Sequence, residues 1–306
     1  MLFKYTDKLY HDWKLAKNNR IGAYDGESSI VYSYLILNKK GEKDYLEYAI
    51  KHAKVIEKIV DYDAKYDLLA GNAGAAYIML MMYELTNELG YLHIAERAII
   101  KLEENSQKQV KGIGWEVEKG ILPMAGIAHG NSGILMPVLR MWEITKKEKY
   151  KILANEIWKY EDSLYDSEHK NWKDMREKQD EGNDKGAMAW CHGAPGILLS
   201  RVICYRFISD EMWKKRLYRD IEKAYAITKQ NWVRDSWSIC HGNIGNYGIL
   251  LLVSVAMDNF DANNKNIFDY NVKLLQQEKL NPGLFNGYSG VLYAFLKKID
   301  ISDVFF

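Results

Sequence analysis

Two short segments of this chain, Cys191-His192-Gly193-Ala194-Pro195-Gly196 and Cys240-His241-Gly242-Asn243-Ile244-Gly245, follow the same pattern. Each places a Cys-His pair directly before a Gly-x-x-Gly, and an apolar run of helical length begins at the glycines. Glycine permits tight turns and a close approach between helices. The pattern therefore predicts two buried helices, each preceded by a turn that carries a cysteine and a histidine.

The same glycine motif recurs along the whole chain at intervals of roughly 45–63 residues. Five of the six motifs have a second glycine three positions after the first, and Ser29 takes that place in the earliest motif. Amphipathic stretches rich in Lys and Glu, such as residues 44–53, separate the apolar runs. A repeat of this length predicts one helical hairpin per repeat, with a buried inner helix and a half-exposed outer helix. The first glycines are Gly26, Gly71, Gly130, Gly193, Gly242 and Gly287.

These hairpins predict an all-α fold with six helix pairs, beginning with an outer helix at about residues 3–17. Buried helices would form an inner ring and amphipathic helices an outer ring, with the glycine turns gathered at one end. An open solenoid of helix pairs is the alternative. The chemistry that converges at the turns favours a closed ring, and residues 1–306 are interpreted as a single domain.

The composition limits the class of protein. The chain has 306 residues, of which 48% are hydrophobic, and a formal net charge of +1, which argues against a strong nucleic-acid-binding surface. No stretch approaches 18 uncharged apolar residues, and residues 1–7 lack the apolar core of a signal peptide. Three cysteines are too few for a disulfide framework. We expect a cytoplasmic, reducing setting, with no transmembrane segment and no nucleic-acid partner.

The cysteines of the paired motifs are candidate metal ligands. The start of a helix carries partial positive charge, which stabilises a thiolate placed there. Cys191 and Cys240 both qualify, and His241 adds a nitrogen donor, so the set suits zinc with a fourth position left open, as in catalytic sites. The alternative is that both cysteines are small core residues beside glycine turns, and their matched contexts argue against it. Cys204, inside an apolar run, is interpreted as core.

Two further polar residues precede glycine turns. His129 has the same offset from Gly130 that His192 and His241 have from their glycines, and Asp67 lies four residues before Gly71. A histidine beside a metal-bound thiolate suits acid–base chemistry at neutral pH, and an aspartate can orient it or transfer a proton itself. The alternatives are a turn-capping histidine for His129 and an ordinary surface or capping carboxylate for Asp67. His192 has three open roles: a metal ligand, a hydrogen-bond donor to a metal ligand, or a contact to substrate. Its spacing does not decide among them.

At these residues the chain resembles a known family. His129-Gly130, Trp190-Cys191-His192-Gly193-Ala194-Pro195-Gly196 and Cys240-His241-Gly242 look like the signatures of the lanthipeptide cyclases, the LanC-like proteins. The resemblance is closest to the C-terminal cyclase domain of class II LanM synthetases, which have histidine where His192 stands and stand-alone LanC enzymes usually have tyrosine. Residues 171–176 and 282–290 also look like LanM segments, so the similarity covers nearly the whole chain.

The resemblance implies an α/α toroid that holds Zn²⁺ through Cys191, Cys240 and His241. It also implies lanthipeptide (lantibiotic) biosynthesis, in which a peptide cysteine thiol adds to dehydroalanine or dehydrobutyrine and forms a thioether ring. His129 and Asp67 are then the proton-transfer residues. The remaining site candidates would contact substrate or support the metal ligands, and they are His192, Trp190 and Arg176.

Two departures from the family pattern bear on function. LanM synthetases carry a large N-terminal dehydratase domain, which we expect to be absent here, so we expect this chain to need a dehydrated precursor peptide and a separate dehydratase. The family toroid has seven helix pairs, of which this chain matches the last six. Either a ring of six pairs closes, or the chain is a trimmed or degenerate cyclase with an open seam, and we expect closure. Three alternatives stay open: a LanC-like protein that adds glutathione to dehydroamino acids, a zinc-containing peptide-binding relative without activity, and an α/α-barrel glycoside hydrolase. The last would need paired carboxylates rather than thiolates.

Overall fold

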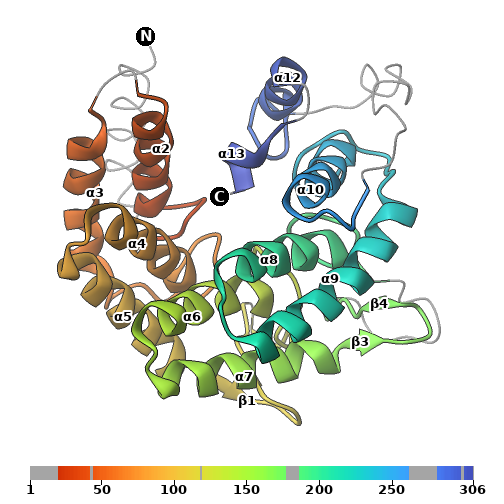
Figure 1. Ribbon diagram of the computed structural model, residues 1–306, viewed down its shortest axis with the longest axis horizontal. Helices are drawn as coiled ribbons and strands as arrows, with labels where there is room; N and C mark the ends of the chain where they lie inside the picture. The colour runs from red at the N-terminus through yellow and green to blue at the C-terminus, as the bar shows by residue number, and fades with distance from the viewer. Residues whose placement is uncertain are drawn as a thin grey trace. The chain divides into compact units, whose positions relative to one another are not determined.

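The computed structural model describes residues 20–41, 44–117, 119–176, 186–261, 281–297 and 300–305. The chain divides after Glu104 into two compact units, Met1–Glu104 and Asn105–Phe306. Helices make up most of the ordered structure in both units (Figure 1), which confirms the predicted all-α class. The outer helix predicted at residues 3–17 lies outside the described residues, and the single domain over residues 1–306 stays a prediction.

The first unit contains two helical hairpins. Helix α2 packs on α3, α4 packs on α5, and α2 also contacts α4. The helices are α2 (Glu27–Lys39), α3 (Leu46–Ile59), α4 (Asn72–Thr86) and α5 (Leu89–Glu104).

The second unit continues the pattern. Helix α6 packs on α7 and α8 on α9, while α6, α8 and α10 contact one another in that order. Two short antiparallel pairs, β1–β2 and β3–β4, interrupt the helices. The elements are β1 (Gln107–Lys108), β2 (Ile113–Gly114), α6 (Asn131–Thr145), α7 (Glu148–Ser163), β3 (Tyr165–Asp166), β4 (Asn171–Trp172), α8 (Ala194–Phe207), α9 (Glu211–Asn231), α10 (Asn243–Ala256), α12 (Tyr288–Leu296) and α13 (Ser302–Phe305).

The repeated glycines mark the starts of helices, as predicted. The first glycine of every motif is the residue directly before one of the helices α2, α4, α6, α8, α10 and α12, which we call the core helices. Most residues of α4, α6 and α8 are buried. The flanking helices α3, α5, α7 and α9 bury one face only. Helix α9, for example, buries Trp213, Leu217, Ile221 and Ala224 at intervals of three and four residues.

The second glycine of the motif is required by close packing against the preceding loop. A Cβ atom at Gly245 would overlap the carbonyl oxygen of Ile239, and one at Gly196 would overlap that of Trp190. In both cases the overlapped carbonyl lies six residues earlier, so the loop before each of these core helices runs back against its first turn. Side chains larger than hydrogen are excluded there because the overlapped atoms belong to the backbone.

Backbone hydrogen bonds join the turns of the second unit into one row. The Ala128 amide donates to the carbonyl of Cys191 at 3.2 Å, and the Trp190 amide donates to that of Cys240 at 2.9 Å. The Cys240 amide in turn donates to Phe285 at 2.9 Å. Successive turns of this unit therefore lie side by side, as the sequence predicted.

Ring closure stays a prediction, because α2 and α12 belong to different units.

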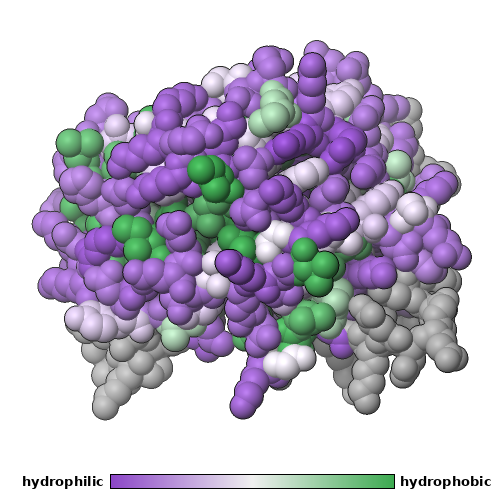
Figure 2. Space-filling model, turned by 90° about the horizontal axis from the view of Figure 1, so that it is seen from below, coloured by the Kyte–Doolittle hydropathy of each residue, from purple (hydrophilic) through white to green (hydrophobic). Residues whose placement is uncertain are grey.

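No helix among the described residues is long and apolar enough to cross a membrane. Figure 2 shows a face of the molecule on which hydrophilic residues predominate, with smaller hydrophobic groups between them.

Candidate metal centre

The turns before α8 and α10 bring the three predicted metal ligands together. The ligand atoms of Cys191, Cys240 and His241 all lie within 4.8 Å of one another, and 3.7 Å separates Cys240 Sγ from His241 Nε2. It is the only such group of His, Cys, Asp and Glu side chains that the described residues contain. Each cysteine lies three residues before its helix, in the position that the glycine motif predicted.

The centre is buried at its sulfur atoms and open at its nitrogen. Cys191 and Cys240 are 4% and 6% exposed, whereas His241 is exposed. All three cysteines of the chain are free thiols. A molecule from solvent can therefore approach the centre from the side of His241.

The two thiols of the centre differ electrostatically from the third cysteine. A hydrogen bond from the Cys240 thiol, assisted by one from His241, outweighs burial and lowers the pKa of Cys191 to about 4. The contact with Cys191 correspondingly raises the pKa of His241. Burial instead raises the pKa of Cys204, inside α8, to about 12, which confirms Cys204 as a core residue. Two sulfur donors and one imidazole form a soft ligand set that fits zinc.

Two histidines stack beside the centre. The rings of His129, from the turn before α6, and His192, from the turn before α8, lie 5.6 Å apart between centroids at an interplanar angle of 29°. His192 is outside the three-residue centre, although it is adjacent to Cys191 in sequence. Burial lowers the pKa of His192 to about 4. The structure thus places His129 and His192 together, at the turn that carries Cys191.

The loop after β4 contributes a charged pair. Arg176 donates from Nε to Asp174 Oδ1 at 2.9 Å and from Nη2 to Oδ2 at 2.5 Å. Burial favours protonated Asp174, but these hydrogen bonds outweigh it and lower the pKa of the carboxyl. The carboxylate is 7% exposed and the guanidinium 42%. Among the smaller effects on the pKa values of His192 and His241, the charge of Arg176 acts to lower both, so Arg176 lies near the centre.

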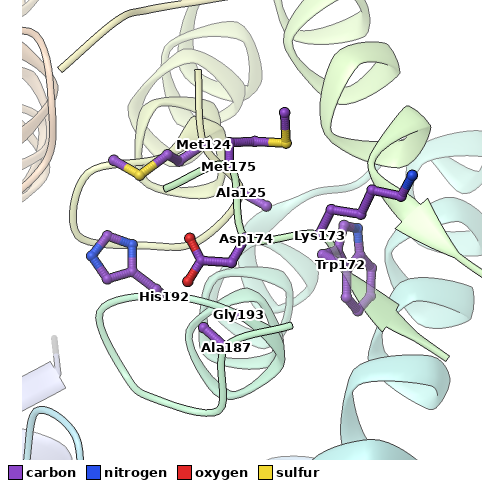
Figure 3. A pocket seen from close by; sticks show the side chains of 9 residues that line it. All are labelled: Met124, Ala125, Trp172, Lys173, Asp174, Met175, Ala187, His192 and Gly193. Carbon is purple, nitrogen blue, oxygen red and sulfur yellow. The ribbon is translucent and has the colours of Figure 1, made fainter. Parts of the chain in front are cut away.

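Asp174 also faces His192. The two side chains line a small cavity of about 10 Å³, and the carboxylate points toward the imidazole in Figure 3. Arg176 was a predicted site residue, whereas Asp174 was not. The Asp-x-Arg spacing was the available signal for Asp174, because it suits a short bidentate pair within one loop.

Two other predicted site residues, Trp190 and Asp67, are buried. The Trp190 indole is 1% exposed and packs against Phe285, with 4.6 Å between ring centroids, so it supports the Cys191 turn from within the core. Asp67, in the first unit, is 3% exposed, and its Oδ1 accepts the Ala70 amide at 2.6 Å. This contact closes a turn in the loop before α4, and the N-cap of α4 itself, Gly71, receives no side-chain cap. A part for Asp67 in proton transfer stays a prediction.

A curated protein is similar in sequence to most of this chain. The chain is 28% identical over 255 residues to the lacticin 481/lactococcin biosynthesis protein LcnDR2 of Lactococcus lactis subsp. lactis, which covers 76% of this chain and 25% of the relative. The chain therefore spans about a quarter of that relative's length.

Solved structures share the fold. Nisin cyclase matches with a TM-score of 0.65 at 20% identity, covering 99% of this chain and 85% of the other. This likeness is consistent with an α/α toroid. An α-1,6-mannanase of Salegentibacter sp. HEL1_6 matches with a TM-score of 0.53 at 16% identity, covering 83% of this chain and 79% of the other. At these identities the likeness concerns fold alone. The family model described as lanthionine synthetase C-like protein matches residues 2–304, and the chain therefore belongs to that family.

Proposed function

We propose that this chain is a lanthipeptide cyclase, which adds a cysteine thiol of a dehydrated peptide to a dehydroalanine or dehydrobutyrine of the same peptide. The observation that carries the proposal is the convergence of Cys191, Cys240 and His241 beside the His129–His192 stack. In the reaction the S–H bond of the thiol breaks, a C–S bond forms at the β-carbon, the C=C bond becomes single, and the α-carbon gains a proton in place of the one that the thiol lost. No oxidant or reductant is needed.

The donor set favours zinc as the metal. Cys191, Cys240 and His241 would hold the ion, which when bound supplies the positive charge that keeps a substrate thiol ionised at neutral pH. The exposed His241 leaves a path from solvent, and the buried sulfur atoms keep the inner side of the centre dry. A peptide thiol would therefore enter from the His241 side.

The histidine stack supplies the groups for proton transfer. Addition at the β-carbon leaves negative charge on the α-carbon and its carbonyl oxygen, and a nearby acid must deliver the proton. His129 is the proposed donor, oriented by its contact with His192. Asp67 is the second proposed proton-transfer residue. Arg176, held in place by Asp174, presents an exposed guanidinium that suits a carbonyl oxygen of the peptide.

The test is a reaction of purified protein with a dehydrated, Cys-containing peptide, with and without glutathione. Ring closure leaves the peptide mass unchanged but removes a thiol, so trapping with N-ethylmaleimide followed by mass spectrometry measures it. Addition of glutathione would instead raise the peptide mass, and unchanged peptide bound to the protein would indicate a binding protein. In a cell, the dehydrated peptide would come from a separate dehydratase.

Metal content provides the matched control. Cys191→Ala and Cys240→Ala should lose both zinc and ring closure, because each removes one of three ligands. Cys204→Ala removes a thiol of the same chain that lies in the core and should keep both. Normal zinc in Cys191→Ala and Cys240→Ala would refute the proposed metal centre.

A further inference from the structure

A buried ion cluster lies between α6, α7, α8 and α9. Arg201 of α8 is 1% exposed and donates from Nε to Asp220 at 3.1 Å, from Nη1 to Ser132 Oγ at 3.2 Å, and from Nη2 to Glu161. Glu161 and Asp220 are also buried, at 0% and 2% exposed. Burying three charges is costly, and apolar side chains of similar volume often pack at least as well. Stability alone therefore does not account for the cluster.

One carboxylate of the cluster accepts hydrogen bonds from the turn that carries His129. Glu161 Oε1 accepts the amide of Gly126 at 3.1 Å and the amide of Ser132 at 3.0 Å. These amides belong to residues three positions before and three positions after His129. The Ser132 hydroxyl lies 2.8 Å from both oxygens of Glu161. The two ends of the turn are thereby tied to a single oxygen atom of α7.

The opposite side of the same turn meets the metal centre. The Ala128 amide donates to the carbonyl of Cys191, and the His129 ring stacks on His192. A Cβ at Gly126 would come within 3.0 Å of the Cys191 carbonyl oxygen. Residues 126–132 thus lie between Glu161 and the Cys191 turn, and a shift of the turn away from Glu161 would move His129 relative to the centre.

We propose that Glu161 is a positioning residue for His129, a role that rests on the proposed cyclase function. The charge of Glu161 makes it a stronger acceptor for the two turn amides than a neutral oxygen would be. Arg201 keeps that charge in the core by pairing with the other carboxylate oxygen. Glu161 touches no substrate and acts only through the place of the His129 ring.

The test is Glu161→Gln, which keeps the side-chain volume but removes the charge, with Asp220→Asn as the matched control. Asp220 contacts Arg201 just as Glu161 does, and no hydrogen bond found for it reaches residues 126–132 in the described part of the chain. Glu161→Gln should slow ring closure by about 10- to 100-fold, the scale found for residues that orient catalytic groups. Zinc content should be unchanged, and Asp220→Asn should close rings at nearly the wild-type rate.

A double-variant experiment separates positioning from general damage to the fold. In a His129→Ala background Glu161→Gln should cause no further loss of rate, because the group through which it acts is absent. The His129 imidazole resonances, assigned with His129→Ala, should shift in Glu161→Gln and stay in place in Asp220→Asn, since stacking on His192 shifts them. If Glu161→Gln does not fold, Ser132→Ala takes its place as the test. It keeps all charges of the cluster and should slow ring closure by a smaller, several-fold factor.

Several results would contradict the positioning role of Glu161. Equal slowing by Glu161→Gln with and without His129, or equal slowing by Asp220→Asn, would overturn the positioning role and leave a structural one. Wild-type rates in both Glu161→Gln and Ser132→Ala would do the same. Wild-type protein that closes no rings would refute the proposed function itself, and the positioning role with it.

Discussion

Replacement of Gly245 by alanine tests why the second glycine of each motif is needed. The new Cβ would overlap the carbonyl oxygen and carbon of Ile239 and come within 3.3 Å of its Cα, and all three are backbone atoms. Overpacking of this kind costs roughly 1–3 kcal/mol, and the upper end applies because no side chain can rotate away. Alanine recovers up to about 1 kcal/mol in helix propensity. We expect a net loss of about 2 kcal/mol in the free energy of unfolding.

Thermal unfolding followed by far-UV circular dichroism measures this loss. For a unit of this size 1 kcal/mol corresponds to about 2–4 °C, so Tm should fall by roughly 4–8 °C. Ile239 adjoins Cys240, so a displaced backbone should also lower the zinc content. Gly90→Ala is the control, because a Cβ at Gly90 in α5 would meet nothing within 4 Å, and it should stabilise the protein by about 0.5 kcal/mol. If Gly245→Ala were as stable as Gly90→Ala, the packing argument for the motif would be wrong.

Three further predictions concern single side chains. His129→Ala should keep its zinc but slow ring closure by about 10²-fold, measured by thiol trapping, and a wild-type rate would make His129 a turn cap only. Arg201→Ala leaves two buried carboxylates without their cation and should cost about 3–5 kcal/mol in chemical unfolding, whereas a loss below about 1 kcal/mol would contradict the buried cluster. Asp210 caps α9 by accepting the Trp213 amide at 2.9 Å, and such contacts outweigh its partial burial and lower its pKa. The stabilisation of α9 by this charged cap is therefore fully present above about pH 4, near the pKa of Asp in the unfolded chain, and it disappears as pH falls through the lower pKa of Asp210 in the folded protein. Asp210→Ala should cost about 1 kcal/mol at pH 7 and progressively less below pH 4, and a pH-independent difference would exclude the charged cap.

The parts of the fold that could be predicted from the sequence are those with local causes. A glycine is needed where a loop returns against the start of a helix. Gly193 and Gly242 therefore predict both the turn and the helix that follows it. The positions of the candidate metal ligands could be predicted as well, because Cys191, Cys240 and His241 stand one or two residues before those glycines. The offset of His129 from Gly130 predicted its place in the same row of turns. Its stacking on His192 could not be predicted, since it depends on which turns become neighbours.

The ion cluster was missed although the sequence carried a signal for it. Arg201 stands inside an apolar run, where a cation requires a buried partner. Glu161 stands among exposed Lys and Glu residues, but helical spacing from the buried Tyr150, Leu153 and Ile157 puts it on the buried face of α7. Each residue taken alone is recognisable as a buried charge. Their pairing depends on the faces that α7 and α8 present to each other, and a single sequence does not give it.

The candidate site therefore combines two kinds of support that differ in how far they reach along the chain. Cys191 and Cys240 are held by the hydrogen bond from Trp190 to the next turn, so their geometry follows from the turns themselves. The His129 turn is held on its other side by Glu161, about thirty residues later in the sequence and on a flanking helix. The proposed metal binding and the proposed proton transfer are for this reason expected to be separable, because a change in α7 would displace His129 without touching Cys191, Cys240 or His241. If the proposed function and the positioning role of Glu161 hold, variation in α7 would alter the rate of ring closure while the metal centre stays intact.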